Sequence, residues 1–421
     1  MSTVGVTTVD LEDVGLDRGG HLLLKRALAS LDPGARVEVR GQSPDLAVHL
    51  RAWCRAAGHA YAPSAADDTA GGGGGRGWGL ARGGEAASRT AGSVTRGTAV
   101  DALFFGAQRA AGSGPGEVAD HAPATWGLAA RGAVVEAGGP AFRFPLDTRA
   151  AVWAYTAAGI YRQAVAAQWD PATAVDWDAP VDLPVEVEAA VVQIMTYLIE
   201  NENAALVVPA RFLAQVHPHF REVMGVLAVQ VADEARHVDV FTRRAQLRGG
   251  PLGMSTAGGQ ASLKTLVDEP DFAVAHFLLS VLGEGTFLSL LSFLERHAPD
   301  AVTRQVTHLA LADEARHVAF GMAHLEHVLA ADAGFRTRLA SAIHRRHDAL
   351  AHTAGLNQEV FDALVVLAAG SWLPRAVSVG FARVQALEAE MADGRRRRLV
   401  RLGFPAEEAA DLAGLHTRNF M

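Results

Sequence analysis

The pattern of apolar positions divides the chain into two parts. From about residue 145 almost to the C-terminus, apolar residues recur at alternate spacings of three and four, which predicts long amphipathic helices. Breaks such as His217-Pro218 and Gly249-Gly250-Pro251 separate these runs. The pattern therefore indicates a mostly helical domain of about 280 residues, which we place at 141–421.

The N-terminal part has shorter elements. Residues 22–31 and 46–57 have helical spacing, while residues 37–39 alternate as a strand does. We expect a small α/β domain over residues 1–65. The Gly-rich stretch that follows, with the run GGGGG at 71–75, favours a linker or irregular segment over 66–140.

One heptapeptide, ADEARHV, occurs twice, at 232–238 and at 312–318. A chance repeat of seven letters is very improbable, so we interpret it as an internal duplication of a helical unit. Each copy places a Glu and a His three residues apart, on one helix face: Glu234 with His237, and Glu314 with His317. Di-iron carboxylate bundles use such Glu-x-x-His pairs on two helices, together with one Glu from each of two others.

A lone Glu upstream of each copy completes this pattern. Glu284 lies 30 residues before Glu314, on a stripe of apolar residues. Upstream of the first copy the choice is between Glu200 and Glu202. Glu202, 32 residues before Glu234, belongs to an unbroken apolar stripe made of Val192, Met195, Ile199, Leu206, Pro209 and Leu213. The stripe through Glu200 contains Gln193, Thr196 and Asn203, and is typical of a solvent face. We choose Glu202 and keep Glu200 as the alternative.

Composition narrows the kind of metal site. The 421 residues include 17 His but only one Cys, Cys54, which excludes a Cys-based zinc site or a protein-held iron–sulfur cluster. Oxygen and nitrogen ligands of the type found here suit Fe(II) or Mn(II). Four buried carboxylates would repel one another, and two divalent cations would neutralise them. We therefore expect two Fe ions, with Mn or mixed Fe/Mn as alternatives, and open positions for O2 as co-substrate.

Charge and hydropathy exclude some partners. With 46 acidic and 38 basic residues the net charge is −8, which argues against nucleic acid or an anionic membrane surface as a partner. The N-terminus lacks a secretory pattern, and no uninterrupted apolar run reaches the roughly 20 residues of a membrane span. We expect a soluble protein of the cytoplasm.

Residues 141–421 resemble the ferritin-like di-iron proteins, a superfamily of oxygenases, desaturases and oxidases. The form Asp-Glu-x-Arg-His is similar to the signature of multicomponent monooxygenase hydroxylases and of p-aminobenzoate N-oxygenase-type enzymes. The resemblance implies that Asp233 accepts a hydrogen bond from His317, and Asp313 one from His237. It also implies that Arg236 and Arg316 balance the charge. The segment Gln168-Trp169-Asp170-Pro171 is similar to the approach to the first helix in this superfamily.

The chain departs from this family at two positions. Phe241 stands where reductase small subunits have a radical Tyr, four residues after the first motif His. Ala310 stands one turn before the second motif, where the N-oxygenase type has a seventh ligand His, and His308 is slightly out of phase. We therefore do not expect a stored tyrosyl radical or a seventh His ligand.

Residues 1–65 resemble the small sulfur-carrier (TusA-like) fold. That family acts through a Cys-Pro-x-Pro motif at the start of its first helix, and this chain has Asp17-Arg18-Gly19-Gly20 near that place. Cys54 lies on the other predicted helix. The domain is therefore expected to lack sulfur-carrier activity.

The expected function is that of a non-haem di-iron oxygenase that hydroxylates or N-oxygenates a small organic substrate. The catalytic and metal-binding residues would be Glu202, Glu234, His237, Glu284, Glu314 and His317. No flavin or iron–sulfur motif is present, so an external reductase or ferredoxin would supply electrons. The alternatives are an oxidase or desaturase that inserts no oxygen, and a metal-binding, storage or scaffold protein. Whether the chain forms a homodimer is left open.

Overall fold

The computed structural model describes residues 7–63, 76–84, 94–95, 118–351 and 358–415. They form two compact units. The first comprises the described residues up to 95 together with 129–141, and the second comprises 118–128 and 142–415. A mostly helical fold with a small sheet-containing unit before it was expected from the sequence, and this fold class is confirmed.

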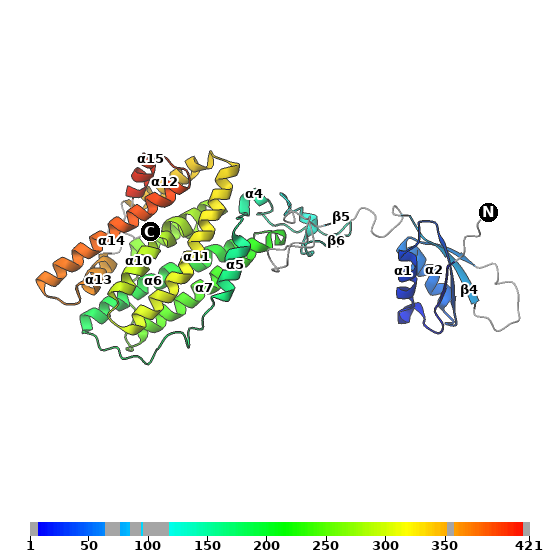
Figure 1. The fold of residues 1–421 in the computed structure, drawn as a ribbon, viewed down its shortest axis with the longest axis horizontal. Helices are drawn as coiled ribbons and strands as arrows, with labels where there is room; N and C mark the ends of the chain where they lie inside the picture. The colour runs from blue at the N-terminus through cyan, green and yellow to red at the C-terminus, as the bar shows by residue number, and fades with distance from the viewer. Residues whose placement is uncertain (1–6, 64–75, 85–93, 96–117, 352–357, 416–421) are drawn as a thin grey trace. The chain divides into compact units, whose positions relative to one another are not determined.

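The first unit is built on a four-stranded sheet with helices α1 and α2 (Figure 1). Its strands lie in the order β1-β2-β4-β3, with β1 parallel to β2 and the other neighbours antiparallel. The buried side chains between the sheet and the helices include Leu24, Val39, Leu50 and Trp78. The elements in chain order are β1 (Thr7–Asp10), η1 (Leu16–Arg18), α1 (Gly20–Ala29), β2 (Arg36–Gly41), α2 (Leu46–Ala57), β3 (Ala60–Pro63), β4 (Arg76–Ala81), and the short pair β5 (Val94–Thr95) and β6 (Val134–Val135).

The boundary expected at residue 65 is wrong, because strand β4 lies between β2 and β3 in this sheet. Glycine hid the strand from the sequence analysis: Gly77 and Gly79 alternate with Trp78 and Leu80, both of which are buried. A Cβ on Gly79 would lie 3.2 Å from the carbonyl oxygen of Ala62, so glycine allows the close approach of β3. The run at 71–75 lies outside the described residues.

Cys54 belongs to the core of this first unit. Its side chain is fully buried, and burial raises the pKa of the thiol to about 11. The thiol is therefore protonated near neutral pH and is a poor nucleophile.

The second unit is a bundle of long helices (Figure 1). In chain order it contains η4 (Ala124–Trp126), α4 (Arg149–Val152), α5 (Ala157–Ala166), α6 (Val185–Leu213), η5 (Pro218–Phe220), α7 (Arg221–Gln246), α8 (Ala257–Val267), α9 (Phe272–His276), η6 (Phe277–Glu284), α10 (Gly285–His297), α11 (Ala301–Ala331), α12 (Phe335–Ala351), α13 (Gln358–Ala369), α14 (Pro374–Arg401) and α15 (Ala406–Gly414). Helix α6 packs along α7, and the continuous rod α9–η6–α10 packs along α11, while α7 and α11 also touch. Helices α13 and α14 cover α6 and α10.

The helical unit begins earlier than expected. Residues 118–128, which the sequence placed in the linker, pack against it: Ala122 is fully buried in its core, and the backbone N–H of Ala119 donates to Nε2 of His219 at 3.0 Å. The expected start at residue 141 is therefore too late.

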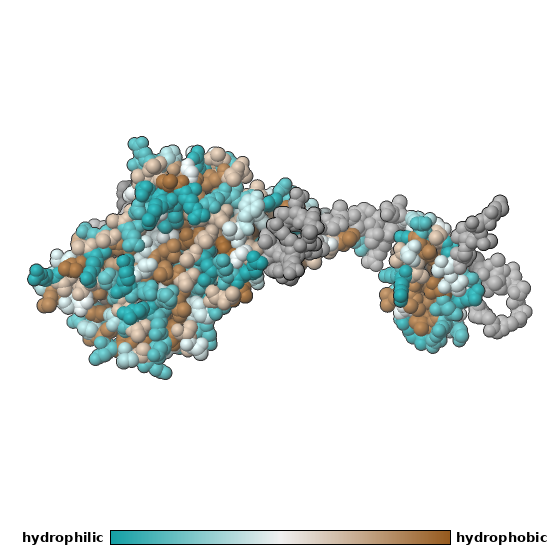
Figure 2. Space-filling model, viewed as in Figure 1, coloured by the Kyte–Doolittle hydropathy of each residue, from teal (hydrophilic) through white to brown (hydrophobic). Residues whose placement is uncertain are grey.

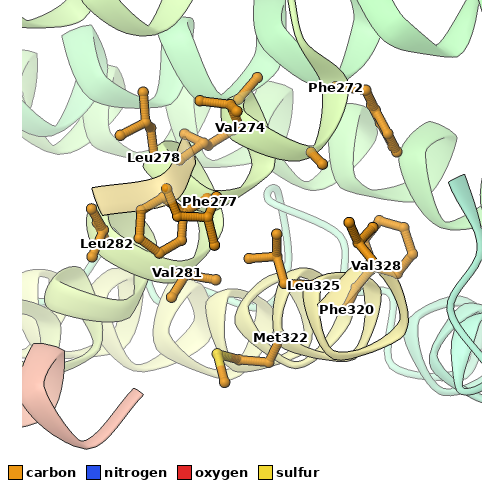
Figure 3. Close-up of a cluster of buried hydrophobic side chains, with 14 of the residues drawn as sticks. Phe272, Val274, Phe277, Leu278, Val281, Leu282, Phe320, Met322, Leu325 and Val328 are labelled. Atoms are coloured by element: carbon orange, nitrogen blue, oxygen red, sulfur yellow. The ribbon is translucent and has the colours of Figure 1, made fainter. Parts of the chain in front are cut away.

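Apolar side chains hold the rod α9–η6–α10 against α11. Phe277 and Val281 of η6 are buried with Phe320 and Leu325 of α11 (Figure 3). The two helices approach closely at Gly321, where an added Cβ would lie 2.6 Å from Cβ of Ser280. This contact fixes the spacing between η6 and α11.

The rod Phe272–His297 is long and apolar enough to cross a membrane, which the sequence analysis did not recognise. Its most apolar window has a mean hydropathy of 1.8, and 83% of that window is buried inside the protein. Hydrophilic side chains are spread over the visible face of the helical unit (Figure 2). The apolar character of the rod is therefore explained by its position in the core.

Candidate metal centre

The six side chains expected to bind metal come together between α6, α7, η6 and α11. They form two groups whose potential ligand atoms lie within 4.8 Å of one another. The first group is Glu202, Glu234, His237 and Glu314, and the second is Glu234, Glu284, Glu314 and His317. No member is more than 4% exposed. Glu234 and Glu314 belong to both groups, so the arrangement suits two neighbouring ions.

Of the two glutamates considered on α6, Glu202 is the one that joins the cluster. Its side chain is 2% exposed and joins the first group, whereas Glu200 is half-buried and belongs to neither. The expected solvent stripe is only partly exposed, since Thr196 is buried and Asn203 is exposed. Helices α7, α8 and α13 all pack on α6, which widens its buried arc.

The lone Glu of the second hairpin is placed by a π-helix. Glu284 is the last residue of η6, which is π-helical from Phe277 onward. Short π-helical turns within α-helices are frequent at functional sites, because they shift a side chain relative to regular α winding.

The ring nitrogens face carboxylates of both motif copies. Nδ1 of His237 lies 3.2 Å from Oε2 of Glu234 and 3.3 Å from Oε1 of Glu314. Nδ1 of His317 lies 3.0 Å from Oε1 of Glu234 and 3.4 Å from Oε2 of Glu314. The duplication thus brings the two Glu-x-x-His pairs face to face.

Burial and crowding perturb the titration of this cluster. Burial raises the pKa of Glu202 and of Glu284, and the neighbouring carboxylates of Glu234 and Glu314 raise it further. For Glu234, burial would raise the pKa, but His317 and His237 lower it below the ordinary value. The carboxylates therefore repel one another, and the positive charge of the two imidazole rings stabilises Glu234 in particular.

Several buried atoms of the cluster have no hydrogen bond of acceptable geometry among the described residues, although some lie 3.0–3.4 Å from a facing group. They are Oε1 of Glu202, Oε1 of Glu234, Oε2 of Glu284, both carboxylate oxygens of Glu314, and Nδ1 of His317. Buried polar atoms without partners are costly and rare in folded proteins. Cations would satisfy them, and four carboxylates with two imidazoles suit Fe or Mn. The residues present therefore fit a two-metal site.

Two aspartates orient the imidazoles from behind. Nε2 of His237 lies 3.2 Å from Oδ2 of Asp313, and Nε2 of His317 lies 3.3 Å from Oδ2 of Asp233. When each Nε2 carries the proton and donates it to the aspartate, Nδ1 is free to face a metal. This crossed pairing, from one motif copy to the other, has the partners implied by the resemblance.

Arg236 and Arg316 neutralise these aspartates. Nη2 of Arg236 donates to Oδ1 of Asp233 and, at 2.9 Å, to Oδ2 of Asp313. Arg316 donates to Asp313 and lies 3.8 Å from Asp233. Burial would raise the pKa of Asp313, but His237 and Arg236 lower it below its ordinary value. Asp313 is thus an acceptor for His237 near neutral pH.

The loop after α5 supplies contacts whose roles the sequence did not reveal. Nε2 of Gln168 donates to Asp233 at 2.9 Å, and its Oε1 accepts from Arg236 at 2.6 Å. Nε1 of Trp169 donates to Oδ2 of Asp313 at 2.9 Å, and its ring is nearly parallel to that of His237. The segment 168–171 was noted only for its resemblance to known relatives, so these hydrogen bonds are a finding of the structure.

Gln230 is a further residue that the sequence analysis missed. Its Nε2 donates to Oε1 of Glu284 at 2.9 Å, and its side chain is 1% exposed. Gln230 lies four residues before Glu234, so helical spacing was the available signal. The corresponding residue of the second copy is Ala310, which is fully buried, whereas the side chain of His308 is exposed and contacts Glu295.

We expect Asp233→Asn to weaken metal binding. The substitution removes the negative charge that accepts from Nε2 of His317. It also adds an amide N–H group that faces the donor groups of Gln168 and Arg236. Loss of such a partner lowers metal affinity by roughly 10–100-fold. Competition with a coloured chelator measures the change. Asp239→Asn, an exposed change on the same helix, is the control, and equal affinity of the two variants would contradict the role of Asp233.

Comparison with known proteins gives only distant likenesses. No protein-family model matches the sequence, and no curated protein matches it. Among solved structures, a Synechococcus protein with aldehyde deformylating oxidase activity has 17% identity and a TM-score of 0.39, with 54% of this chain and 96% of that chain covered. A variant of an R2-like ligand-binding oxidase with a Mn/Fe cofactor has 18% identity and a TM-score of 0.39, with 60% and 92% covered. The R2-like ligand-binding oxidase after photoconversion has 18% identity and a TM-score of 0.40, with 62% and 93% covered.

Proposed function

We propose that this chain is an O2-dependent di-metal oxidoreductase, a non-haem di-iron oxygenase that hydroxylates or N-oxygenates a small organic substrate. The observation that carries the proposal is the pair of buried ligand groups that share Glu234 and Glu314. Two Fe ions are the proposed cofactor, with Mn or mixed Fe/Mn as alternatives. When bound, such metals supply the redox chemistry that amino-acid side chains lack.

The protein's own part is to hold and insulate the metals. The aspartates and arginines behind His237 and His317 keep both rings in one orientation. Phe241, which is fully buried with its ring centroid 6.2 Å from that of His237, keeps water away from this side and offers no phenol for radical storage. A buried site of this kind limits side reactions of activated oxygen.

The proposal extends to partners. Electrons would come from an external reductase or ferredoxin, because the chain has one Cys and no iron–sulfur motif. We place the protein in the cytoplasm, with no nucleic-acid or membrane partner, consistent with its net charge of −8. Size-exclusion chromatography of the metal-loaded protein distinguishes a monomer from a homodimer.

Anaerobic loading with Fe(II), followed by metal analysis and addition of O2, tests the proposal. We expect two ions per chain and rapid O2 consumption. Fewer than one ion per chain would overturn it, and many ions per chain would favour storage instead. Analysis of products formed with ¹⁸O2 separates an oxygenase, which inserts label, from an oxidase or desaturase, which does not.

A further inference from the structure

A small cavity lies on the helical unit beside the rod that carries Glu284. Its volume is about 40 Å³, enough for about three water molecules, since one needs roughly 10–15 Å³. Apolar side chains make most of its wall, among them Leu278 and Leu282 of η6 and Leu412 of α15. Arg346 on α12 and Arg395 on α14 also line it.

Arg395 is buried without a charged partner. Its side chain is 5% exposed, and its Nε and Nη2 are buried atoms with no hydrogen-bond partner in the described part of the chain. Among the described residues its single polar contact is a long one, with Nη1 3.4 Å from the hydroxyl oxygen of Thr286. Burial lowers the pKa of Arg395 to about 10, so the group is still charged near neutral pH.

Arg346 is only partly buried, but it too lacks a charged partner among the described residues. Its Nη2 donates to the hydroxyl oxygen of Ser262 at 2.9 Å, while Nη1 is buried and has no partner among the described residues. Nearby, Arg398 donates from Nε to the carbonyl oxygen of Val281 at 2.7 Å, and its Nη2 also lacks a partner there. Within the described ranges, none of these three arginines forms an ion pair with a carboxylate.

Arg244, by contrast, is a buried arginine whose charge is paired with carboxylates. Its guanidinium is fully buried and donates to both carboxylate oxygens of Glu188 at 2.9 Å and to Asp300 at 2.8 Å. An unpaired buried charge is expensive, and proteins normally avoid it. The unpaired guanidinium groups at the cavity therefore indicate a missing anion.

We propose that Arg395 and Arg346 bind the carboxylate of a small organic acid, whose apolar body lies against Leu278 and Leu282. A guanidinium presents paired N–H donors that match a carboxylate. A carboxylate also fits better than a phosphate, because the space is small and most of the remaining wall is apolar, with His347 as the polar exception. No residue that lines this cavity belongs to the two candidate ligand groups, so its occupancy does not require metal.

The first test is calorimetric titration of the full chain with acetate, propionate, propanol and inorganic phosphate. Propionate should bind, and more tightly than acetate by about fourfold, because the cavity buries its extra methylene. Propanol should bind far more weakly, because it brings no charge to the arginines. Propanol binding as tightly as propionate, or phosphate binding more tightly, would overturn the carboxylate assignment.

Variants locate the binding site. Arg395→Met and Arg346→Met keep much of the side-chain volume and remove the charge, and each should raise the Kd for propionate by roughly 30-fold or more. Arg397→Met, on the same helix as Arg395 and with its side chain 67% exposed, is the matched control and should bind as the parent does. The midpoint of thermal unfolding without ligand should stay the same or rise in Arg395→Met, because this charge has no ion-pair partner among the described residues. Arg346→Met also loses the hydrogen bond to Ser262, so circular dichroism checks that this variant is folded. Unchanged propionate binding in either folded cavity variant would refute the proposal.

Discussion

Glu314→Ala is expected to reduce bound metal from two ions per chain to one at most. Glu314 belongs to both ligand groups, and neither of its buried carboxylate oxygens has a hydrogen-bond partner in the described structure. Its removal therefore takes a ligand from both positions at once. Metal analysis after reconstitution with Fe(II) and removal of excess iron measures the loss, and circular dichroism checks that the variant is folded.

Glu202 and Glu200 provide the matched comparison. Glu202 belongs to one group only, so Glu202→Ala should keep about one ion per chain, while Glu200→Ala should keep both. The opposite order would show that the half-buried Glu200 is the ligand on α6. Two ions retained by Glu314→Ala would contradict the assignment of the shared ligand.

Arg244→Ala is expected to lower the free energy of unfolding by about 3–5 kcal/mol, the typical cost of breaking a buried ion pair. The side chain is fully buried, and it joins Glu188 of α6 to Asp300 at the start of α11. Oδ1 of Asp300 in turn accepts from the backbone N–H of Thr303 at 2.7 Å and caps that helix. The variant leaves two acidic groups without their cation.

Denaturant titration measures this loss. The control is Arg304→Ala, an exposed change near the same helix end, which should shift stability by less than about 0.5 kcal/mol. A similar shift in both variants would contradict the structural role of Arg244.

The dependence of stability on pH in the acid range should also change in Arg244→Ala. Burial alone would raise the pKa of Asp300, but Arg244 and Thr303 hold it below its ordinary value. The stability from this pair is therefore present above the ordinary carboxyl pKa and is lost as the pH falls through the lowered value. Arg244→Ala should lack that part of the pH dependence.

The sequence located the candidate metal ligands because a repeated motif and a helical stripe are local patterns. The two copies of Asp-Glu-x-Arg-His contain four of the six candidates, and periodicity favoured Glu202 over Glu200. The contacts of Gln168 and Trp169 could not be found in this way. Their partners, Asp233 and Asp313, lie 65 and 144 residues away in the chain, and no local spacing encodes such pairs.

The long helices of the fold could also be predicted from the sequence, whereas two other elements could not. Helices α6 and α7, of 29 and 26 residues, have periodic apolar patterns, whereas the 31-residue helix α11 has a weak one and was located by its copy of the repeated motif. Strand β4 was missed because alternate glycines remove half of its side-chain signal. The π winding of η6 was equally hidden, since the same apolar residues are compatible with an α-helix.

The π-helical conformation of η6 sets the directions in which its side chains point, and both the candidate metal site and the arginine-lined cavity depend on those directions. A π-helix has more residues per turn than an α-helix, so rewinding Phe277–Glu284 into α form would turn every side chain after its first about the helix axis. Glu284 would swing relative to α7 and α11, and Leu278 and Leu282 would turn in the wall of the arginine-lined cavity. The π-helical conformation of these eight residues thus positions a carboxylate of the candidate metal site and shapes a cavity wall on the same rod.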